Sequence, residues 1–244
     1  MYQYNDDSLM LHNDLYQINM AESYWNDGIH ERIAVFDLYF RKMPFNSGYA
    51  VFNGLKRVVN FIENFGFTNE DITYLKSIGY EEDFLNYLKD LKFTGNIKSM
   101  QEGEICFGNE PLLRVEAPLI QAQLIETILL NIINFQTLIA TKASRIRQIA
   151  THDTLMEFGT RRAQEIDAAL WGARAAFIGG FDSTSNVRAG KLFNIPVSGT
   201  HAHALVQTYG DEYIAFKKYA ERHKNCVFLV DTFHTLKSGV QIGR

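Results

Sequence analysis

The amino-acid sequence predicts a mixed α/β fold, in which an α+β domain over residues 1–120 precedes bridging helices and the first half of an α/β barrel over residues 121–244. From residue 153 onward, short apolar runs alternate with helix-length amphipathic segments, which is typical of a parallel sheet or barrel with right-handed crossovers. Before residue 153, helical and strand patterns mix without a regular repeat. The chain has 244 residues, 46% of them hydrophobic and 21% charged, and is long enough to bury at least one sizeable core.

In the first part, apolar residues recur at helical spacing over residues 55–65 and 84–91, whereas residues 34–40 have the aromatic and branched content of a strand. Two short apolar runs within residues 104–116 flank Gly108 and Asn109. Both of these residues tolerate a positive φ, so we expect a hairpin there. Residues 118–150 predict one or two long, largely buried helices.

The second part predicts four strands, over residues 153–158, 176–181, 195–198 and 226–230, and three helices, over residues 163–175, 184–193 and 203–222. Parallel strands place the loops that follow them on one face of the sheet, where active sites collect in barrels and open α/β sheets. The loops expected there are residues 159–162, 182–185, 199–203 and 231–234. Four such units cannot close an eight-stranded barrel, so we expect a shortened chain.

Composition excludes several functional classes. A formal net charge of -4 offers no electrostatic reason to expect nucleic acid or an anionic membrane as partner. Cys106 and Cys226 lie far apart without a metal-ligand spacing, so we expect a reducing, cytoplasmic environment. Residues 1–7 are acidic where a signal peptide is basic, and the longest uncharged run, residues 127–141, is too short to span a bilayer. We therefore expect a soluble protein that is not exported.

The four loops hold groups that bind phosphate. They contain Arg161 and Arg162, Asp182 beside three hydroxyl residues, and two histidines separated by one residue. Guanidinium forks, hydroxyls and backbone N–H groups bind phosphate oxygens, so a phosphorylated small molecule is the natural inference. The alternative is that both arginines open an exposed helix and that Asp182 and Ser183 are ordinary N-caps.

The histidine pair has two interpretations. A His-x-His segment at the end of a barrel strand can supply two imidazole ligands to a metal, with His234 and Asp231 as the available further ligands, as in a metal-dependent hydrolase. Of these interpretations we do not favour the metal site. We expect His201 to be a solvated loop residue. His203, at a predicted helix start, can keep one ring nitrogen unprotonated and act as nucleophile or base.

Six stretches then become recognisable in order: residues 14–17 (DLYQ), 40–45 (FRKMPF), 157–162 (EFGTRR), 179–187 (GGFDSTSNV), 199–203 (GTHAH) and 229–232 (LVDT). Over essentially its whole length the sequence resembles the nicotinate phosphoribosyltransferases, which have the type II phosphoribosyltransferase fold. The resemblance implies that nicotinate is joined to phosphoribosyl pyrophosphate, giving nicotinate mononucleotide and pyrophosphate for NAD salvage. It also implies coupled ATP hydrolysis, a requirement for Mg²⁺ and a homodimer with shared active sites.

The resemblance assigns roles to individual residues. It implies that His203 is the histidine phosphorylated by ATP and that His201 occupies the variable position of the motif. It also implies that Arg161 is the arginine that contacts phosphate. Phe158 and Tyr16, the latter from the partner subunit, would stack on the pyridine ring, because a flat electron-poor ring suits an aromatic face. The remaining assignments are Thr200 to nicotinate, Arg41 to phosphate across the dimer, and Asp182 to magnesium, phosphate or its own backbone.

Ser185 would distinguish the acid from the amide. Related enzymes that use nicotinamide carry an aspartate at this position, which would repel a carboxylate, whereas a serine can donate a hydrogen bond to it. Two further alternatives stay open. One is an enzyme of the same fold that uses nicotinamide or another pyridine, and the other is a silent fragment that serves as a dimerisation or binding module. The family's chains are normally longer, with later strands that carry ribose-phosphate loops.

Overall fold

The computed structural model describes residues 9–244, which form two compact units. Of the described residues, one unit holds residues 9–151 with Ile178–Gly180, and the other holds His152–Phe177 with Phe181–Arg244. The expected boundary at residue 120 thus falls inside the first unit. The acidic segment at residues 1–7 lies outside the described residues. Among the described residues, no helix is both long and apolar enough to cross a membrane.

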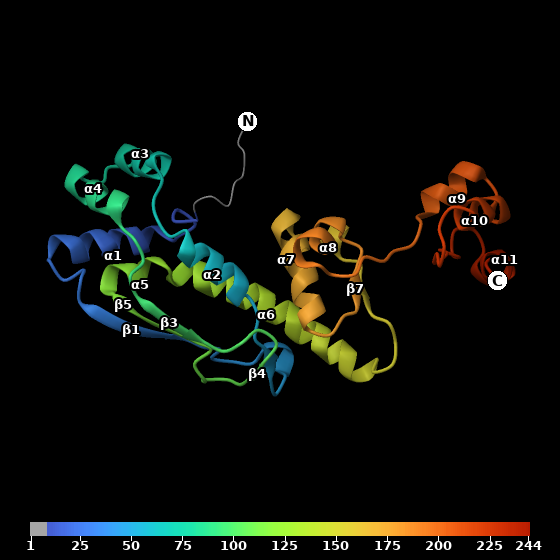
Figure 1. Cartoon of the computed structure of the whole chain (residues 1–244), viewed down its shortest axis with the longest axis horizontal. Helices are drawn as coiled ribbons and strands as arrows, with labels where there is room; N and C mark the ends of the chain where they lie inside the picture. Colours follow the sequence, from blue (N-terminus) through green and yellow to red (C-terminus); the bar gives the residue numbers. More distant parts are fainter. Residues whose placement is uncertain (1–8) are drawn as a thin grey trace. The chain divides into compact units, whose positions relative to one another are not determined.

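The first unit contains two small antiparallel sheets (Figure 1). Strands β1 (Ile33–Leu38), β5 (Leu113–Pro118) and β3 (Asn96–Ser99) are ordered β1-β5-β3, while β2 (Ala50–Val51) pairs with β4 (Ile105–Cys106). The strand expected at residues 34–40 is therefore present as β1. The expected hairpin is wrong, because β4 and β5 join different sheets. Asn109 does have a positive φ of 62°, but its N–H donates to the carbonyl of Phe40 rather than closing a two-strand turn.

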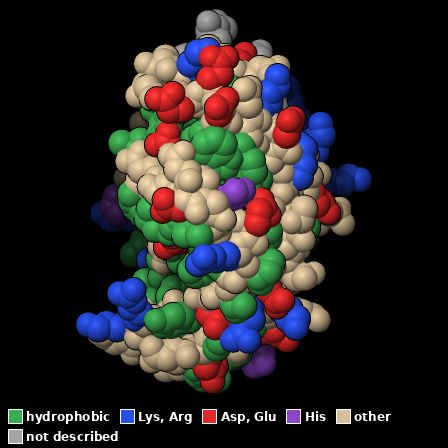
Figure 2. Space-filling model, turned by 90° about the vertical axis from the view of Figure 1, so that its left-hand side faces the viewer, with side chains coloured by type: hydrophobic (Ala, Val, Ile, Leu, Met, Phe, Trp, Pro, Cys, Tyr) green, Lys and Arg blue, Asp and Glu red, His purple; other side chains and the backbone are tan. Residues whose placement is uncertain are grey.

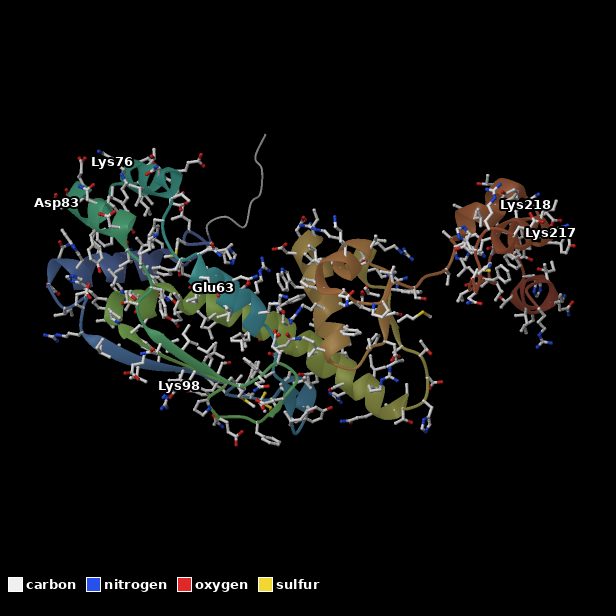
Figure 3. The ribbon with its side chains drawn as sticks, in the orientation of Figure 1. Glu63, Lys76, Asp83, Lys98, Lys217 and Lys218 are labelled. Atoms are coloured by element: carbon white, nitrogen blue, oxygen red, sulfur yellow. The ribbon has the colours of Figure 1, made fainter. Side chains whose placement is uncertain are left out.

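Six helices accompany these sheets in the described part of the first unit: α1 (Leu15–Asn26), α2 (Leu55–Glu63), α3 (Asn69–Ser77), α4 (Glu82–Asp90), α5 (Leu119–Leu124) and α6 (Glu126–Ile149). The helices expected near residues 55–65, 84–91 and 118–150 are present. Helix α3 begins at a capping box, in which Thr68 and Asp71 each accept a hydrogen bond from the other's backbone N–H. The charged side chains labelled in Figure 3, such as Lys76 on α3 and Asp83 on α4, are exposed.

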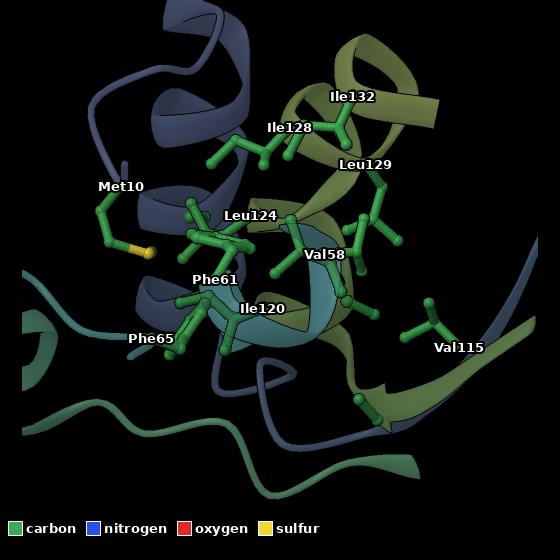
Figure 4. Close-up of a cluster of buried hydrophobic side chains, with 14 of the residues drawn as sticks. Met10, Val58, Phe61, Phe65, Val115, Ile120, Leu124, Ile128, Leu129 and Ile132 are labelled. Atoms are coloured by element: carbon green, nitrogen blue, oxygen red, sulfur yellow. The ribbon is translucent and has the colours of Figure 1, made fainter. Parts of the chain in front are cut away.

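Helices α5 and α6 belong to the first unit because their apolar faces form its core (Figure 4). Ile120, Leu124 and Ile128 are almost completely buried there beside Val58 and Phe61 of α2. Burying each large side chain of this kind stabilises a fold by about 1.5–3 kcal/mol. A domain boundary ahead of these helices would expose that face to water.

Polar residues of α6 also hold the β2 segment. The hydroxyl of Thr141 accepts a hydrogen bond from the N–H of Val51 at 2.9 Å. The hydroxyl of Thr137 bonds both the N–H and the carbonyl of Asn53 at 3.1 Å. Both threonines are completely buried, so these bonds satisfy backbone groups that water cannot reach.

The second unit has the expected parallel pairing. Strand β6 (Met156–Glu157) pairs in parallel with β7 (Ser183–Thr184), and single parallel bridges join Thr184 to Val197 and Thr200 to Val227. Its helices are α7 (Glu165–Ile178), α8 (Val187–Phe193), α9 (His203–Tyr209), α10 (Glu212–Ala220) and α11 (Val240–Ile242), with short 3-10 and π turns at Thr160–Arg162 and Thr235–Gly239.

Two expected elements of this unit are wrong. Residues 176–181 are not a strand, because α7 ends only at Ile178 and is followed by a turn at Gly180, whose φ of 104° suits glycine. The strand is instead Ser183–Thr184, which was expected to lie in a loop. The helix expected over residues 203–222 is two helices, since Gly210 adopts a left-handed conformation with a φ of 70° between α9 and α10.

Candidate functional site

The corner after β6 is held by the carboxylate of Glu157. One carboxylate oxygen accepts a hydrogen bond from the N–H of Gly159, and the other accepts from the hydroxyl of Thr184 on β7 at 2.7 Å. A Cβ added to Gly159 would lie 2.6 Å from the Glu157 carboxylate, so a larger residue there would have to displace this carboxylate. Phe158, between the two anchored residues, remains 39% exposed. The corner thus presents an aromatic ring to solvent from a fixed backbone.

Ser185 lies next to this corner through the backbone. Its N–H donates to the carbonyl of Glu157 at 2.9 Å, and its side chain is half-buried. The residue that caps α8 is Asn186, whose side-chain oxygen accepts from the N–H of Ala189 at 2.9 Å. Ser185 is therefore not the cap, and its backbone is bonded to Glu157, the residue before Phe158.

Asp182 has a structural partner. Its carboxylate accepts from the N–H of Leu155 at 2.7 Å, and its own N–H donates to the carbonyl of Leu155 at 2.8 Å. This reciprocal pair continues the β6–β7 ladder by one residue. The carboxylate thus binds the backbone of another segment, at Leu155, rather than its own backbone. Arg161 and Arg162 lie exposed in the turn that follows Phe158.

His201 is not a solvated loop residue. Its ring is only 7% exposed and lies among Phe216, Tyr219 and Phe228, with ring centroids 5.4, 5.1 and 6.1 Å away. Its Nε2 accepts a hydrogen bond from the N–H of Leu229 at 3.2 Å. The expectation failed because the residues that bury this ring come from α10 and from the segment after the Val227 bridge, both of which follow it in the chain.

His203 faces the loop after the next strand segment. Its Nδ1 lies 3.1 Å from the hydroxyl oxygen of Thr232, and its Nε2 lies 4.0 Å from a carboxylate oxygen of Asp231. The His203 side chain is 51% exposed and that of Asp231 is 56% exposed. An accessible imidazole with one nitrogen held by a hydroxyl and the other near a carboxylate can act as nucleophile or base. Thr200, which is exposed, donates from its hydroxyl to the carbonyl of His201 at 2.9 Å.

The metal-hydrolase alternative requires His201, His203 and His234 to converge. His201 uses its Nε2 for the N–H of Leu229, which leaves that nitrogen unable to ligate a metal. Across residues 9–244, no group of three or more His, Cys, Asp or Glu side chains is placed to hold a metal ion.

Tyr16 and Arg41, in the first unit, line one cavity of about 650 Å³ together with Asp37 and Glu126. Tyr16 is 50% exposed, and its hydroxyl accepts a hydrogen bond from Gln17, which also donates to Glu126. The Arg114 guanidinium bonds both oxygens of Asp37, and this hydrogen bonding lowers the pKa of the Asp37 carboxyl from its usual value. With Asp14 also in its lining, the cavity combines aromatic rings, an exposed arginine and three carboxylates.

Residues 11–134 match the model of the nicotinate phosphoribosyltransferase N-terminal domain, over more than half of the chain. The chain belongs to the nicotinate phosphoribosyltransferase family. It is 67% identical to the nicotinate phosphoribosyltransferase of Bacillus subtilis over 98% of this chain and 49% of that protein. It is also 47% identical to nicotinate phosphoribosyltransferase 2 of Arabidopsis thaliana over 81% of this chain and 36% of that protein. The chain spans about half the length of the Bacillus relative and less of the Arabidopsis one.

Solved structures agree with this family assignment. The structure of human nicotinic acid phosphoribosyltransferase superposes with a TM-score of 0.85 at 31% identity, over 94% of this chain and 56% of that one. Nicotinate-nucleotide pyrophosphorylase from Pyrococcus furiosus superposes with a TM-score of 0.78 at 25% identity, over 96% of this chain and 53% of that one. The predicted fold class, a mixed α/β fold of the type II phosphoribosyltransferase kind, is confirmed.

Sequence reasoning missed Glu157, Thr184 and Thr232 as parts of the site. Glu157 and Thr232 lie inside stretches that carry the family resemblance, and that position was the available signal for them. Thr184 also lies inside such a stretch, residues 179–187, but a threonine in a short polar run resembles an ordinary helix-capping residue. Its role becomes visible only when β7 is paired with β6.

Proposed function

We propose that this protein is a nicotinate phosphoribosyltransferase of NAD salvage. It joins nicotinate to phosphoribosyl pyrophosphate, giving nicotinate mononucleotide and pyrophosphate, with ATP hydrolysis coupled through a phosphorylated histidine. The observation that carries the proposal is the accessible imidazole of His203 between Thr232 and Asp231. Family membership supports the substrate class.

His203 is the proposed phosphate acceptor. When Nδ1–H donates to the Thr232 hydroxyl, the lone pair of Nε2 is free to attack the γ-phosphorus of ATP. The bond from Nε2 to phosphorus forms as the bond from phosphorus to the β,γ-bridging oxygen breaks. ADP leaves with that electron pair, and the positive charge on the ring stays at Nδ1–H, which Thr232 holds.

Asp231 is the carboxylate that fits Mg²⁺ at this site. Mg²⁺ is usually bound through one or two carboxylates together with substrate phosphates, and it neutralises the phosphate oxygens. The Asp231 side chain is half-exposed beside His203, so it can receive a nucleotide-bound cation. Arg161 and Arg162 are the exposed cations that we assign to phosphate, including that of phosphoribosyl pyrophosphate.

We assign the pyridine ring of nicotinate to a stack on Phe158, beside Ser185, with Thr200 as a further polar contact. Exposed aromatic rings on a fixed backbone suit a flat electron-poor ring. The second face of the stack is Tyr16 of a partner copy in a homodimer, with Arg41 of that copy on phosphate. Exposed apolar side chains of α1 and β1 support such an interface: Leu15, Tyr16, Ile33, Val35 and Phe36. Hydrophobic side chains likewise lie exposed among charged ones on the face drawn in Figure 2.

The partners we propose are therefore small molecules and a second copy, without nucleic acid or membrane. A cytoplasmic location agrees with the two cysteines, neither of which forms a disulfide.

Labelling with γ-phosphate-labelled ATP tests the role of His203. We expect acid-labile, base-stable label on the wild-type protein, no label on His203→Ala, and full label on His152→Ala, which removes an exposed histidine of the same unit. The melting temperature of His203→Ala should stay unchanged, because an exposed side chain contributes little to the core. Undiminished labelling of His203→Ala would refute the assignment.

Substrate competition tests Ser185. An aspartate there would repel the nicotinate carboxylate and accept from an amide NH₂, so Ser185→Asp should shift preference from nicotinate toward nicotinamide. The ratio of kcat/KM for the two pyridines measures this preference. An unchanged ratio would show that Ser185 does not select the acid, and a wild-type preference for nicotinamide would favour the alternative of a nicotinamide-using enzyme.

A further inference from the structure

We propose that His201 is a positioning residue, whose buried neutral ring ties the His203 loop to the strand segment that carries Asp231 and Thr232. This inference rests on the proposed role of His203. It assigns different tasks to the two histidines of the GTHAH motif. The first fixes the backbone, and the second remains exposed.

The hydrogen bond defines the tautomer of His201. Leu229 N–H is a donor, so the Nε2 that receives it carries no proton. The ring is therefore neutral with its proton on Nδ1, which lies 3.3 Å from the carbonyl oxygen of Ala202. Both ring nitrogens then have partners within a largely apolar enclosure formed by Phe216, Tyr219 and Phe228.

The positions along the chain connect this bond to the reactive pair. His201 precedes His203 by two residues, and Leu229 precedes Asp231 by two residues. Just before these positions, Thr200 and Val227 form a parallel bridge. The bridge and the His201 bond are thus two successive links between the same two segments. The next contact along both segments is that of His203 with Thr232 and Asp231.

Packing alone does not require a histidine here. An aromatic or aliphatic side chain could occupy the enclosure, but it would leave the Leu229 N–H without its acceptor. A backbone N–H that is denied a partner favours local rearrangement toward solvent. We therefore expect a hydrophobic replacement to keep the helices packed while Asp231 and Thr232 move from His203.

Two replacements of His201 separate these roles. In His201→Gln, the side-chain carbonyl oxygen can reach the Nε2 position and accept from Leu229, whereas His201→Phe fills the enclosure without an acceptor. Loss of orientation at a reacting atom costs rate steeply, so the labelling rate from ATP should fall at least about tenfold in His201→Phe. It should stay within about threefold of wild type in His201→Gln.

A packing control is Phe216→Leu, which disturbs the same enclosure without touching the hydrogen bond. We expect it to lower the melting temperature at least as much as His201→Phe while keeping the labelling rate. If Phe216→Leu and His201→Phe lower the melting temperature equally and also lower the labelling rate equally, the effect comes from packing. That result would overturn the proposal. Wild-type labelling by a folded His201→Phe would overturn it as well.

A spectroscopic readout keeps the inference separate from the proposed function. In protein labelled with ¹⁵N-histidine, the Nδ1 and Nε2 shifts of His203 report its tautomer, which the Thr232 contact biases toward one form. His201→Phe should change these shifts and His201→Gln should preserve them, whether or not ATP phosphorylates the protein. If shifts respond as expected but no variant is labelled, the positioning inference holds and the phosphohistidine assignment fails. Unchanged His203 shifts in a folded His201→Phe variant would refute the positioning role of His201 and leave the proposed function untouched.

Discussion

Replacing Thr184 by valine removes one hydroxyl from the centre of the second unit. The Thr184 side chain is completely buried, donates to the Glu157 carboxylate at 2.7 Å and accepts from the N–H of Asn186 at 3.1 Å. Valine has almost the same shape, so the substitution leaves no cavity and forces no overpacking. Any loss of stability therefore comes from the two hydrogen bonds.

The size of the loss can be worked from these two bonds. A hydrogen bond to a charged group contributes about 1.5–3 kcal/mol and a neutral one about 0.5–1.5 kcal/mol. Glu157 keeps its bond from Gly159, so its charge is not left wholly unpartnered. We expect Thr184→Val to lower the free energy of unfolding of this unit by about 2–4 kcal/mol. For a unit of this size, that corresponds to a fall in melting temperature of at least about 8 °C.

Tryptophan fluorescence can report this unit alone, because the chain has two tryptophans and each unit contains one. Trp171 lies on α7, 5.0 Å from the ring of Phe193, whereas Trp25 packs in the first unit. In a Trp25→Phe background, the denaturation of Trp171 fluorescence in urea measures the effect of Thr184→Val.

The matched control is Thr208→Val on α9, whose hydroxyl donates to the carbonyl of Ala204 at an exposed position. This variant should change the free energy of unfolding by no more than about 0.5 kcal/mol. If Thr184→Val costs as little as the control, the Glu157–Thr184 pair does not anchor the corner, and the account of how Phe158 is held is wrong.

Two further predictions concern the first unit. In Gly95→Ala, the new Cβ would lie 2.3 Å from the Cβ of Ala117, so urea denaturation should show a loss of about 1–3 kcal/mol, whereas Gly48→Ala, with nothing within 4 Å, should show none. Burial raises the pKa of the Cys106 thiol to about 11, so at pH 8 Ellman's reagent should modify Cys226 and reach Cys106 only after unfolding. Because the folded-state pKa is raised, this thiol's contribution to stability is present below pH 9 and is lost as the pH rises toward 11. Equal losses in the two glycine variants, or rapid modification of folded Cys106, would contradict these accounts.

Local periodicity was sufficient to predict much of the first unit. Helix α2 buries Val58 and Phe61 on one face, and this spacing can be read within the segment itself. The pairing of short apolar runs could not be read in this way. The runs that contain Cys106 and Leu113 are close in sequence, yet Cys106 pairs with Ala50 and Leu113 with Leu38, because strand partners are chosen by the packing of distant segments.

The same limit applies to the candidate site. His203 and Phe158 are proposed site residues because their motifs are local, and the structure leaves both exposed. The environment of His201 depends on Phe216 and Phe228, which follow it in the chain, so no feature of the GTHAH motif indicates its burial. The alternation from residue 153 predicted parallel pairing correctly, but apolar residues 176–178 fit a helix end as well as a strand.

The candidate site in the second unit has two parts, one at Phe158 and one at His203. In each part, a side chain that accepts a hydrogen bond from a neighbouring segment lies close in sequence to an exposed functional residue. Glu157 accepts from Thr184 on the neighbouring strand, and the next residue, Phe158, is exposed. His201 accepts from Leu229, and His203, two residues later, is half-exposed. A side chain that must meet a ligand cannot be fixed by its own burial, so its orientation depends on the backbone beneath it. An acceptor that bonds the neighbouring segment fixes that backbone within one or two residues. Replacing the acceptor should therefore impair the site while the exposed residue itself is unchanged.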